Sequence, residues 1–169
     1  TRLLTVTGVQ TCALPILDAG ADRVSLADTV GHADPLSVSR LFERARRLVG
    51  DRLSCAHFHD TRGLALANVL AALDQGVTRF DASLAGLGGC PHAPGASGNA
   101  ATEDLAFMLQ AMGCDAGLDL DALLALRARL VAWIPGQPTH GSLWRAGLPR
   151  VLPPHAESSP LPHDQGLPA

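Results

Sequence analysis

Hydrophobic positions fall into two kinds of pattern that alternate between residues 23 and 133. Short apolar runs bounded by polar residues or glycine predict buried strands, and longer stretches with helical spacing predict helices. The predicted strands cover 23–27, 53–60 and part of 77–88, and the predicted helices cover 35–49, 64–75, 102–112 and 121–133. This alternation predicts a parallel sheet with helices packed on it.

The first long helix has clear start and stop signals. Asp34 stands at the expected N-cap, Pro35 occupies the first helical position, and a glycine follows the last apolar residue. Leu41, Ala45 and Leu48 fall on one helical face, with arginines on the other. We therefore expect these three residues to face the sheet.

Three strands are too few to close a barrel. They match the last three strand–helix units of an eight-stranded TIM (β/α)₈ barrel, in which functional residues gather at the C-terminal ends of the strands. The predicted fold class is α/β: an incomplete barrel over residues 17–150, with further helices at its C-terminal end.

Both ends of the chain differ from its middle. The segment VTGVQTCALPI, residues 6–16, has no clear helical or strand period and matches the translation of one reading frame of a common DNA-sequencing adaptor primer. A natural apolar strand and turn is the alternative. We expect residues 1–16 to be foreign, with the native chain beginning near Leu17, partway through a gene. Residues 151–169 are rich in proline and serine, which predicts a disordered tail.

Composition excludes several classes of protein. The net charge is −3 with no basic stripe, which argues against nucleic-acid binding, and no apolar run of membrane-spanning length occurs. The four cysteines show no C-x-x-C pair and predict a reduced, cytoplasmic protein. All 13 basic residues are arginine, a bias typical of GC-rich bacterial genomes.

Two histidines end the second predicted strand. Residues i and i+2 of a strand share a face, so His57 and His59 are expected to project together, with Phe58 turned toward the helices. Two imidazoles on one rigid element can bind one metal ion. The alternative is one buried histidine bonded to the backbone and one at the surface. Asp60 could orient a histidine, but capping of the following loop is the better interpretation.

Other polar residues follow the strands. Asp28 ends the first strand, where a carboxylate suggests catalysis, with capping of the next turn as the alternative. Cys90 lies in a glycine-rich loop that suits a general acid or nucleophile, with an inert thiol as the alternative. Asn99 could bind a metal through its side-chain oxygen, but by itself suggests a helix cap. Solvated positions are expected for His92, His140, His155, His163, Arg62 and Arg145.

Three motifs in this order resemble one enzyme family. SLADTVG, HFHDTRGLALANVLAALDQGV and FDASLAGLGGCPHAPGASGNAATEDL are similar to the 3-hydroxy-3-methylglutaryl-CoA lyases, which belong to the DRE-TIM metallolyase group with a pyruvate carboxyltransferase domain. The resemblance covers about residues 17–150. The loop that contains Cys90 is its most specific part, because sister enzymes that condense acetyl-CoA with 2-oxo acids usually have a shorter loop without this cysteine.

The resemblance implies a set of functional residues. His57 and His59 would bind a divalent cation, Mg²⁺ or Mn²⁺, and Asn99 would complete the protein ligands on this segment. Cys90 would be the catalytic cysteine, Asp28 an active-site carboxylate, and His57 also a relay for the hydroxyl proton. His92 stands where the family more often has tyrosine. The implied substrate is an acyl-CoA, the pathway leucine breakdown, and the full-length enzyme a homodimer.

The chain also departs from the family pattern. The family's first strand carries an Arg-Asp pair, which supplies a further metal ligand, and a glutamate follows on the next unit; these are absent here. We therefore expect the 169-residue chain by itself to be inactive and poorly folded. Two alternatives remain: a lyase for a related 3-hydroxy-3-alkylglutaryl-CoA or citramalyl-CoA, or a Claisen-condensing enzyme, and a fragment that only binds metal.

Overall fold

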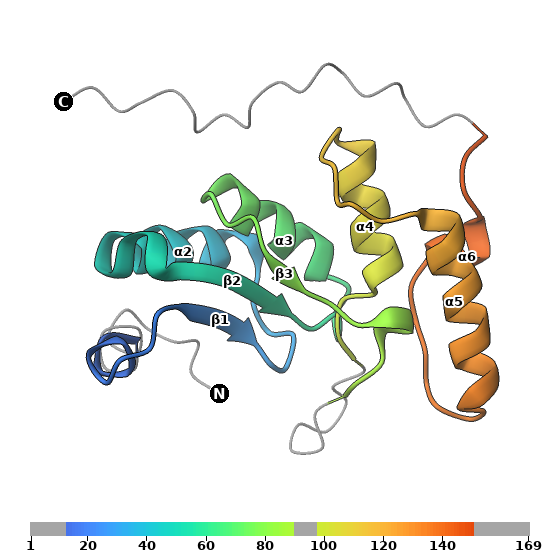
Figure 1. Ribbon diagram of the computed structural model, residues 1–169, viewed down its shortest axis with the longest axis horizontal. Coiled ribbons are helices and arrows are strands. Elements are labelled where there is room, and N and C mark those ends of the chain that lie inside the picture. The colour runs from blue at the N-terminus through green and yellow to red at the C-terminus, as the bar shows by residue number, and fades with distance from the viewer. Residues whose placement is uncertain (1–12, 90–97, 151–169) are drawn as a thin grey trace. The chain divides into compact units, whose positions relative to one another are not determined.

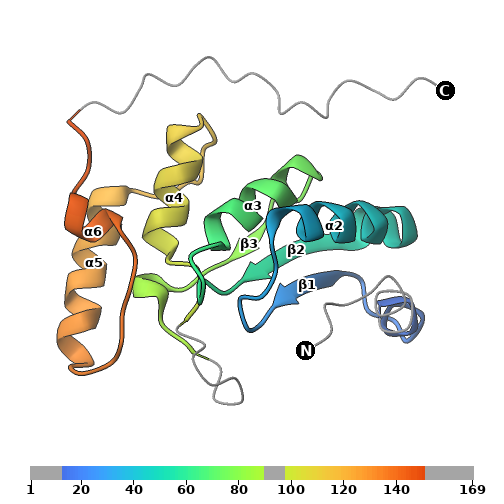
Figure 2. The same ribbon diagram turned by 180° about the vertical axis from the view of Figure 1, so that it is seen from behind.

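The structure is a computed structural model that describes residues 13–89 and 98–150 (Figures 1 and 2). These residues form two compact units, the first over 13–81 and the second over 82–89 together with 98–150. The predicted catalytic Cys90, the neighbouring His92, which was expected to be solvated, and the predicted tail at 151–169 lie outside the described residues.

The first unit is a parallel sheet with helices on one face, as the sequence predicts (Figure 1). Its elements are β1 (Val24–Asp28), α2 (Pro35–Val49), β2 (Leu53–Phe58), α3 (Ala65–Asp74) and β3 (Phe80–Asp81), with a 3₁₀ turn at Gly50–Arg52. The strand order is β1-β2-β3, and both pairings are parallel. The third strand takes up two residues of the predicted strand-and-loop segment 77–88, and Leu84–Gly86 in the same segment forms a 3₁₀ turn in which Ala85 adopts a φ of 60°.

Helix α2 begins and ends where the sequence predicts, but its buried face is displaced by about one residue. The buried positions are Val38, Phe42, Ala45 and Val49. Leu41 and Leu48, which were expected to face the sheet, are only partly buried. The Phe42 ring, whose centroid lies 6.2 Å from that of Phe58 on β2, shows which face packs against the sheet.

The N-cap of α2 supports a testable prediction. The Asp34 carboxylate accepts hydrogen bonds from the Ser37 hydroxyl at 2.6 Å and the Ser37 amide at 3.0 Å. These bonds, the side-chain bond first, hold the pKa of Asp34 below its ordinary value. Asp34→Ala should lower the free energy of unfolding by about 1 kcal/mol at neutral pH, because an amide of the first turn loses its acceptor.

The pH dependence of this effect has a defined sign. A carboxyl group with a lowered pKa in the folded state stabilises the fold above its ordinary pKa and loses that contribution as the pH falls. In urea unfolding of the full-length protein, the difference in stability between wild type and Asp34→Ala should therefore shrink below about pH 4. The fully exposed Asp51 provides a control, since Asp51→Ala should change stability little. A difference that stays constant down to pH 2 would contradict the capping role.

The second unit is helical. It contains α4 (Thr102–Ala111), α5 (Leu120–Trp133) and the short α6 (Leu143–Ala146), which pack around buried Ala106, Leu120 and Leu143. The sequence predicted α4 and α5 to within two residues but missed α6. The Asp104 carboxylate of α4 accepts hydrogen bonds from the Ser142 and Leu143 amides at 2.7 and 2.8 Å, which fixes the start of α6.

The described chain begins with a helix that ends just before Gly20, where the stretch LDAG indicates a helix end. Residues 13–18 are helical, although the sequence shows no clear helical period up to residue 16, and Ala13 and Leu17 are buried. The foreign origin of residues 6–16 stays a prediction. Cys55 and Cys114, the two cysteines within the described ranges, form no disulfide. No helix among the described residues is long and apolar enough to span a membrane.

Candidate metal-binding and catalytic site

The two histidines predicted as metal ligands lie together at the C-terminal end of β2. Their ring centroids are 5.2 Å apart, with the ring planes inclined by 65°. His59 is 5 % exposed and His57 is partly buried, so neither imidazole is fully solvated. The arrangement agrees with the shared face that the i, i+2 spacing predicts.

The alternation of β2 explains this placement. Ala56 and Phe58 are buried at 0 % and 3 % exposure, and Phe58 contacts Phe42 of α2 on the helix-covered side of the sheet. Because successive side chains of a strand point to opposite faces, His57 lies on the other face. Hydrophobic burial of Phe58 therefore fixes the direction of the imidazole beside it.

Asp28 ends the neighbouring strand, and its backbone oxygen accepts the His59 amide at 3.2 Å. Its carboxylate, however, binds the following turn: it accepts hydrogen bonds from the His32 amide at 3.0 Å and the Ala33 amide at 2.9 Å. This is the capping role that the sequence left as the alternative. A catalytic role for Asp28 stays a prediction.

The loops that follow β1 and β2 are joined at this end of the sheet. Arg62 is exposed, as expected, and its guanidinium donates to the Val30 and Gly31 carbonyls at 3.2 and 3.0 Å. Gly31 has a φ of 65°, and a Cβ there would lie 3.0 Å from the His59 oxygen. Asp60 caps its loop as expected, since its carboxylate accepts the Ala65 amide at 2.9 Å.

The sequence interpretation missed a further carboxylate, Asp81, which lies beside His57 on the neighbouring strand. Asp81 on β3 is the register partner of His57, and paired residues of neighbouring strands point to the same face. Burial, with Asp81 nearby as the second cause, raises the pKa of the Cys55 thiol. Cys55 therefore stays a protonated thiol, in line with a packing role.

Asn99 lies in the second unit, and the structure overturns the helix-cap interpretation. The N-cap of α4 is Ala101, which makes no side-chain capping bond. The Asn99 amide nitrogen instead donates to the Leu87 carbonyl at 2.6 Å and the Gly88 carbonyl at 3.3 Å. Its Oδ1 atom is buried and accepts no hydrogen bond from the described residues. That oxygen is thus oriented and available to a ligand.

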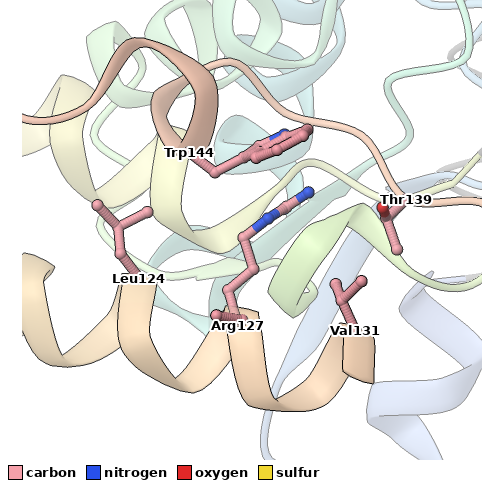
Figure 3. A pocket seen from close by; sticks show the side chains of 6 residues that line it. Leu124, Arg127, Val131, Thr139 and Trp144 are labelled. Carbon is pink, nitrogen blue, oxygen red and sulfur yellow. The ribbon is translucent and has the colours of Figure 1, made fainter. Parts of the chain in front are cut away.

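The second unit also contains a buried ion pair that the sequence interpretation missed. Glu103 and Arg127 are 0 % and 3 % exposed, and the guanidinium donates to the carboxylate. The Arg127 guanidinium lies 5.0 Å from the ring centroid of Trp144, beside a pocket of about 260 Å³ (Figure 3). Because the positive charge of Arg127 is paired with the negative charge of Glu103, Arg127 presents no unpaired charge to a ligand in this pocket.

His140 is not solvated as expected. It is partly buried, and its Nε2 atom is shielded from solvent without a hydrogen-bond partner among the described residues. The sequence gave no indication that His140 is partly buried, because His140 lies in an irregular segment between α5 and α6.

The donor atoms of each unit are of kinds that bind divalent cations in proteins. In the first unit, two imidazoles lie together at a strand end. In the second unit, the buried Asn99 Oδ1 atom has no hydrogen-bond partner among the described residues. Imidazole nitrogen and amide oxygen both act as metal ligands. Within residues 13–89 and 98–150, no cluster of three or more His, Cys, Asp or Glu side chains is arranged to hold a metal.

Comparison with known proteins gives consistent results. The HMGL-like family model matches residues 7–130, a range that begins inside the segment with the adaptor resemblance. The hydroxymethylglutaryl-CoA lyase of Pseudomonas mevalonii is 48% identical over 117 residues, which are 69% of this chain and 39% of that protein. A Pseudomonas aeruginosa protein named 3-hydroxy-3-isohexenylglutaryl-CoA/hydroxymethylglutaryl-CoA lyase is 43% identical over 67% of this chain and 38% of its own length.

Solved structures agree with these relatives. The HMG-CoA lyase from Acinetobacter baumannii in complex with coenzyme A and 3-methylmalate has a TM-score of 0.79 and 42% sequence identity. The match covers 92% of this chain and 49% of that one. This chain thus spans about two fifths of the length of the curated relatives and about half of the solved chain.

Proposed function

Because this chain belongs to the HMGL-like family, we propose that it is the C-terminal part of a hydroxymethylglutaryl-CoA lyase. The full-length enzyme would cleave (S)-3-hydroxy-3-methylglutaryl-CoA to acetyl-CoA and acetoacetate. The observation that carries this proposal is the His57–His59 pair, with its rings 5.2 Å apart at the end of a parallel strand. Relatives at 43% and 48% identity that are named as such lyases support it.

The remainder of the enzyme would supply the rest of the barrel. The three parallel strands described here would be its last three, and the missing strands would contribute the Arg-Asp pair of the family pattern. At the C-terminal ends of these strands, where TIM-barrel enzymes place their active sites, lie the histidine pair and Asp28.

His57, His59 and Asn99 are the residues of this chain that would hold the divalent cation. A cation at that position stabilises negative charge on the substrate oxygen. The strand fixes both imidazoles, and the Leu87 and Gly88 carbonyls hold the Asn99 amide so that its oxygen is turned away from them. Such fixed neighbours are what metal ligands require to keep their orientation.

The chemical step assigns proton transfers to two side chains. His57 takes part in the relay of the tertiary hydroxyl proton to the aspartate of the family's Arg-Asp pair, which the missing strands would supply, and the bond between the carbinol carbon and the thioester-bearing CH₂ group breaks. A carbonyl forms on the acetoacetate side, and the electron pair passes to the acetyl-CoA enolate. The Cys90 thiol then donates its proton to the enolate carbon to give the methyl group. Proton transfer from the aspartate back to the thiolate, directly or through water, restores the enzyme.

A second substrate class is favoured by one comparison. The Pseudomonas aeruginosa relative is named for a longer isohexenyl substrate as well as for the hydroxymethyl one. A 3-hydroxy-3-alkylglutaryl-CoA with a longer alkyl chain is therefore the alternative acyl-CoA substrate. A role in leucine breakdown in the cytoplasm of a bacterium, with the full-length enzyme a homodimer, completes the proposal.

Product analysis with the full-length protein tests the function. With Mg²⁺ and hydroxymethylglutaryl-CoA, it should release acetoacetate and acetyl-CoA in equal amounts, and kcat/KM should exceed that for the isohexenyl analogue. The 169-residue chain alone should be inactive. Failure of the full-length protein to cleave either thioester would reject the lyase assignment. Robust turnover by the purified chain would show that the missing strands are dispensable.

Replacement of the loop cysteine separates chemistry from metal binding. Cys90→Ser in the full-length lyase should lower turnover by about 100-fold, because the hydroxyl is a much weaker acid than the thiol it replaces. Mn²⁺ affinity should stay within about twofold of wild type. Cys55→Ser, at the packed thiol of β2, is the matched control and should retain most of the turnover. Equal losses of turnover and metal affinity in Cys90→Ser would instead assign this cysteine a structural role.

A further inference from the structure

Gly86 and Gly98 approach each other closely, and neither position has room for a side chain. We call this backbone contact between Gly86 and Gly98 the neck. A Cβ on Gly98, whose φ is 145°, would overlap the Gly86 carbonyl oxygen. A Cβ on Gly86, whose φ is 64°, would overlap the His140 imidazole. The Nε2 atom of His140 lies only 2.8 Å from the position of a Cβ on Gly98. The imidazole of His140 therefore packs against both glycines at once.

Backbone hydrogen bonds fix His140 in this place. Its amide donates to the Ala85 carbonyl at 3.0 Å, and its carbonyl accepts from the Arg127 guanidinium at 2.8 Å. Arg127 also binds the fully buried Glu103, whose carboxylate oxygens accept the Ala85 amide at 3.1 and 3.2 Å. These hydrogen bonds thus connect the 3₁₀ turn at Leu84–Gly86 with His140, the residue that packs against the neck.

Asn99 follows the neck directly. Its side-chain amide nitrogen donates to the carbonyls of Leu87 and Gly88. Asn99 follows Gly98 in the chain, and Leu87 and Gly88 follow Gly86, so these bonds join the two stretches that meet at the neck. The direction of its buried Oδ1 atom therefore depends on how these two backbone stretches lie against each other. A change in the packing at the neck would turn that oxygen.

We propose that His140, held by Arg127, is a positioning residue that keeps the Asn99 side-chain oxygen in its ligand orientation. The inference rests on the proposed function, in which Asn99 is a metal ligand. The volume of the His140 ring would hold Asn99 in this orientation, because the His140 Nε2 atom has no hydrogen-bond partner among the described residues. A ring without nitrogen should therefore serve equally well.

The test compares His140→Ala with His140→Phe in the full-length protein. Free Mn²⁺ is measured by electron paramagnetic resonance during a titration. His140→Ala should weaken Mn²⁺ binding about tenfold, the loss typical of residues that orient metal ligands. His140→Phe should stay within about twofold of wild type. Arg129→Met is the control, because Arg129 lies on the same helix as Arg127 but contacts the exposed Trp133 and leaves the neck untouched.

A second measurement does not depend on the metal. Amide hydrogen exchange at Gly86 and Leu87, whose amides donate to the Ser83 and Leu84 carbonyls, should accelerate in His140→Ala and stay unchanged in His140→Phe and Arg129→Met. If His140→Ala does not fold, His140→Leu, which fills part of the space, should show the same direction of change in both measurements.

The outcomes separate this inference from the proposed function. A folded His140→Ala protein with wild-type Mn²⁺ affinity and exchange rates would overturn the positioning role alone. A loss in His140→Phe as large as that in His140→Ala would overturn it too, since the nitrogen would then be required. A wild-type protein that binds no Mn²⁺ and cleaves no substrate would instead reject the proposed function, and hydrogen exchange would still decide whether His140 holds the neck.

Discussion

His57→Ala in the full-length protein is expected to lower the proposed lyase turnover by about 1,000-fold, equivalent to the loss of ~4 kcal/mol of transition-state stabilisation. The substitution removes one of the two imidazoles at the end of β2, whose rings lie 5.2 Å apart. It also removes the residue proposed to take part in the relay of the hydroxyl proton. Both losses act on the same step, so excess Mn²⁺ should restore only part of the rate.

The measurements are Mn²⁺ affinity and turnover on the same preparation. His32→Ala is the matched control: His32 is an exposed histidine near the same strand ends, and only its backbone amide takes part in a described contact, with Asp28. This control should keep both properties. Unchanged Mn²⁺ affinity and turnover in His57→Ala would show that the ligand assignment is wrong.

Arg127→Met should destabilise the fold by about 3–5 kcal/mol, because it leaves a buried carboxylate without its cation. Glu103 is fully buried, and after the substitution only the Ala85 amide would remain of its described donors. Arg127 also supports the His140 carbonyl and lies 5.0 Å from the Trp144 ring, so its removal affects several contacts of the second unit.

An exposed pair of the same chemistry provides the comparison. Arg47 and Glu43 form an i, i+4 pair on α2 whose side chains are 74% and 52% exposed. Arg47→Met should change the free energy of unfolding by less than about 1 kcal/mol, since surface pairs contribute little. Adding Glu103→Gln to Arg127→Met should recover part of the lost stability, because a neutral amide costs less to bury than an unpaired charge. Equal changes in the free energy of unfolding in Arg127→Met and Arg47→Met would contradict the claim that the buried pair stabilises the fold more than the exposed one.

Local signals in the sequence were enough to predict the elements of the first unit. Asp34, Pro35 and a following glycine predict α2 closely because capping chemistry acts within one turn. The alternation around Phe58 predicts that His57 and His59 share a face, because a strand has a period of two. The sequence did not locate β3 within the segment 77–88, and it gave no indication of the turn at Ala85, because an alanine does not signal a positive φ.

The residues that the sequence did not reveal depend on tertiary contacts. Glu103 and Arg127 are 24 positions apart on different helices, and no spacing rule connects them. Asn99 by itself suggested a helix cap because it shortly precedes the helix predicted at 102–112, whereas the N-cap is Ala101 and the Asn99 side chain bonds to Leu87 and Gly88. Resemblance to a family, and not the local pattern, was what pointed to this amide as a ligand.

The most direct measurement of the proposed metal site is electron spin-echo envelope modulation of Mn²⁺ bound to the full-length protein. Nitrogen modulation from two imidazole ligands is expected, and it should fall to that of one in His57→Ala. The rings of His57 and His59 are close enough for both to reach a single ion. A spectrum of bound Mn²⁺ without imidazole nitrogen would contradict the assignment of this strand as the metal-binding element.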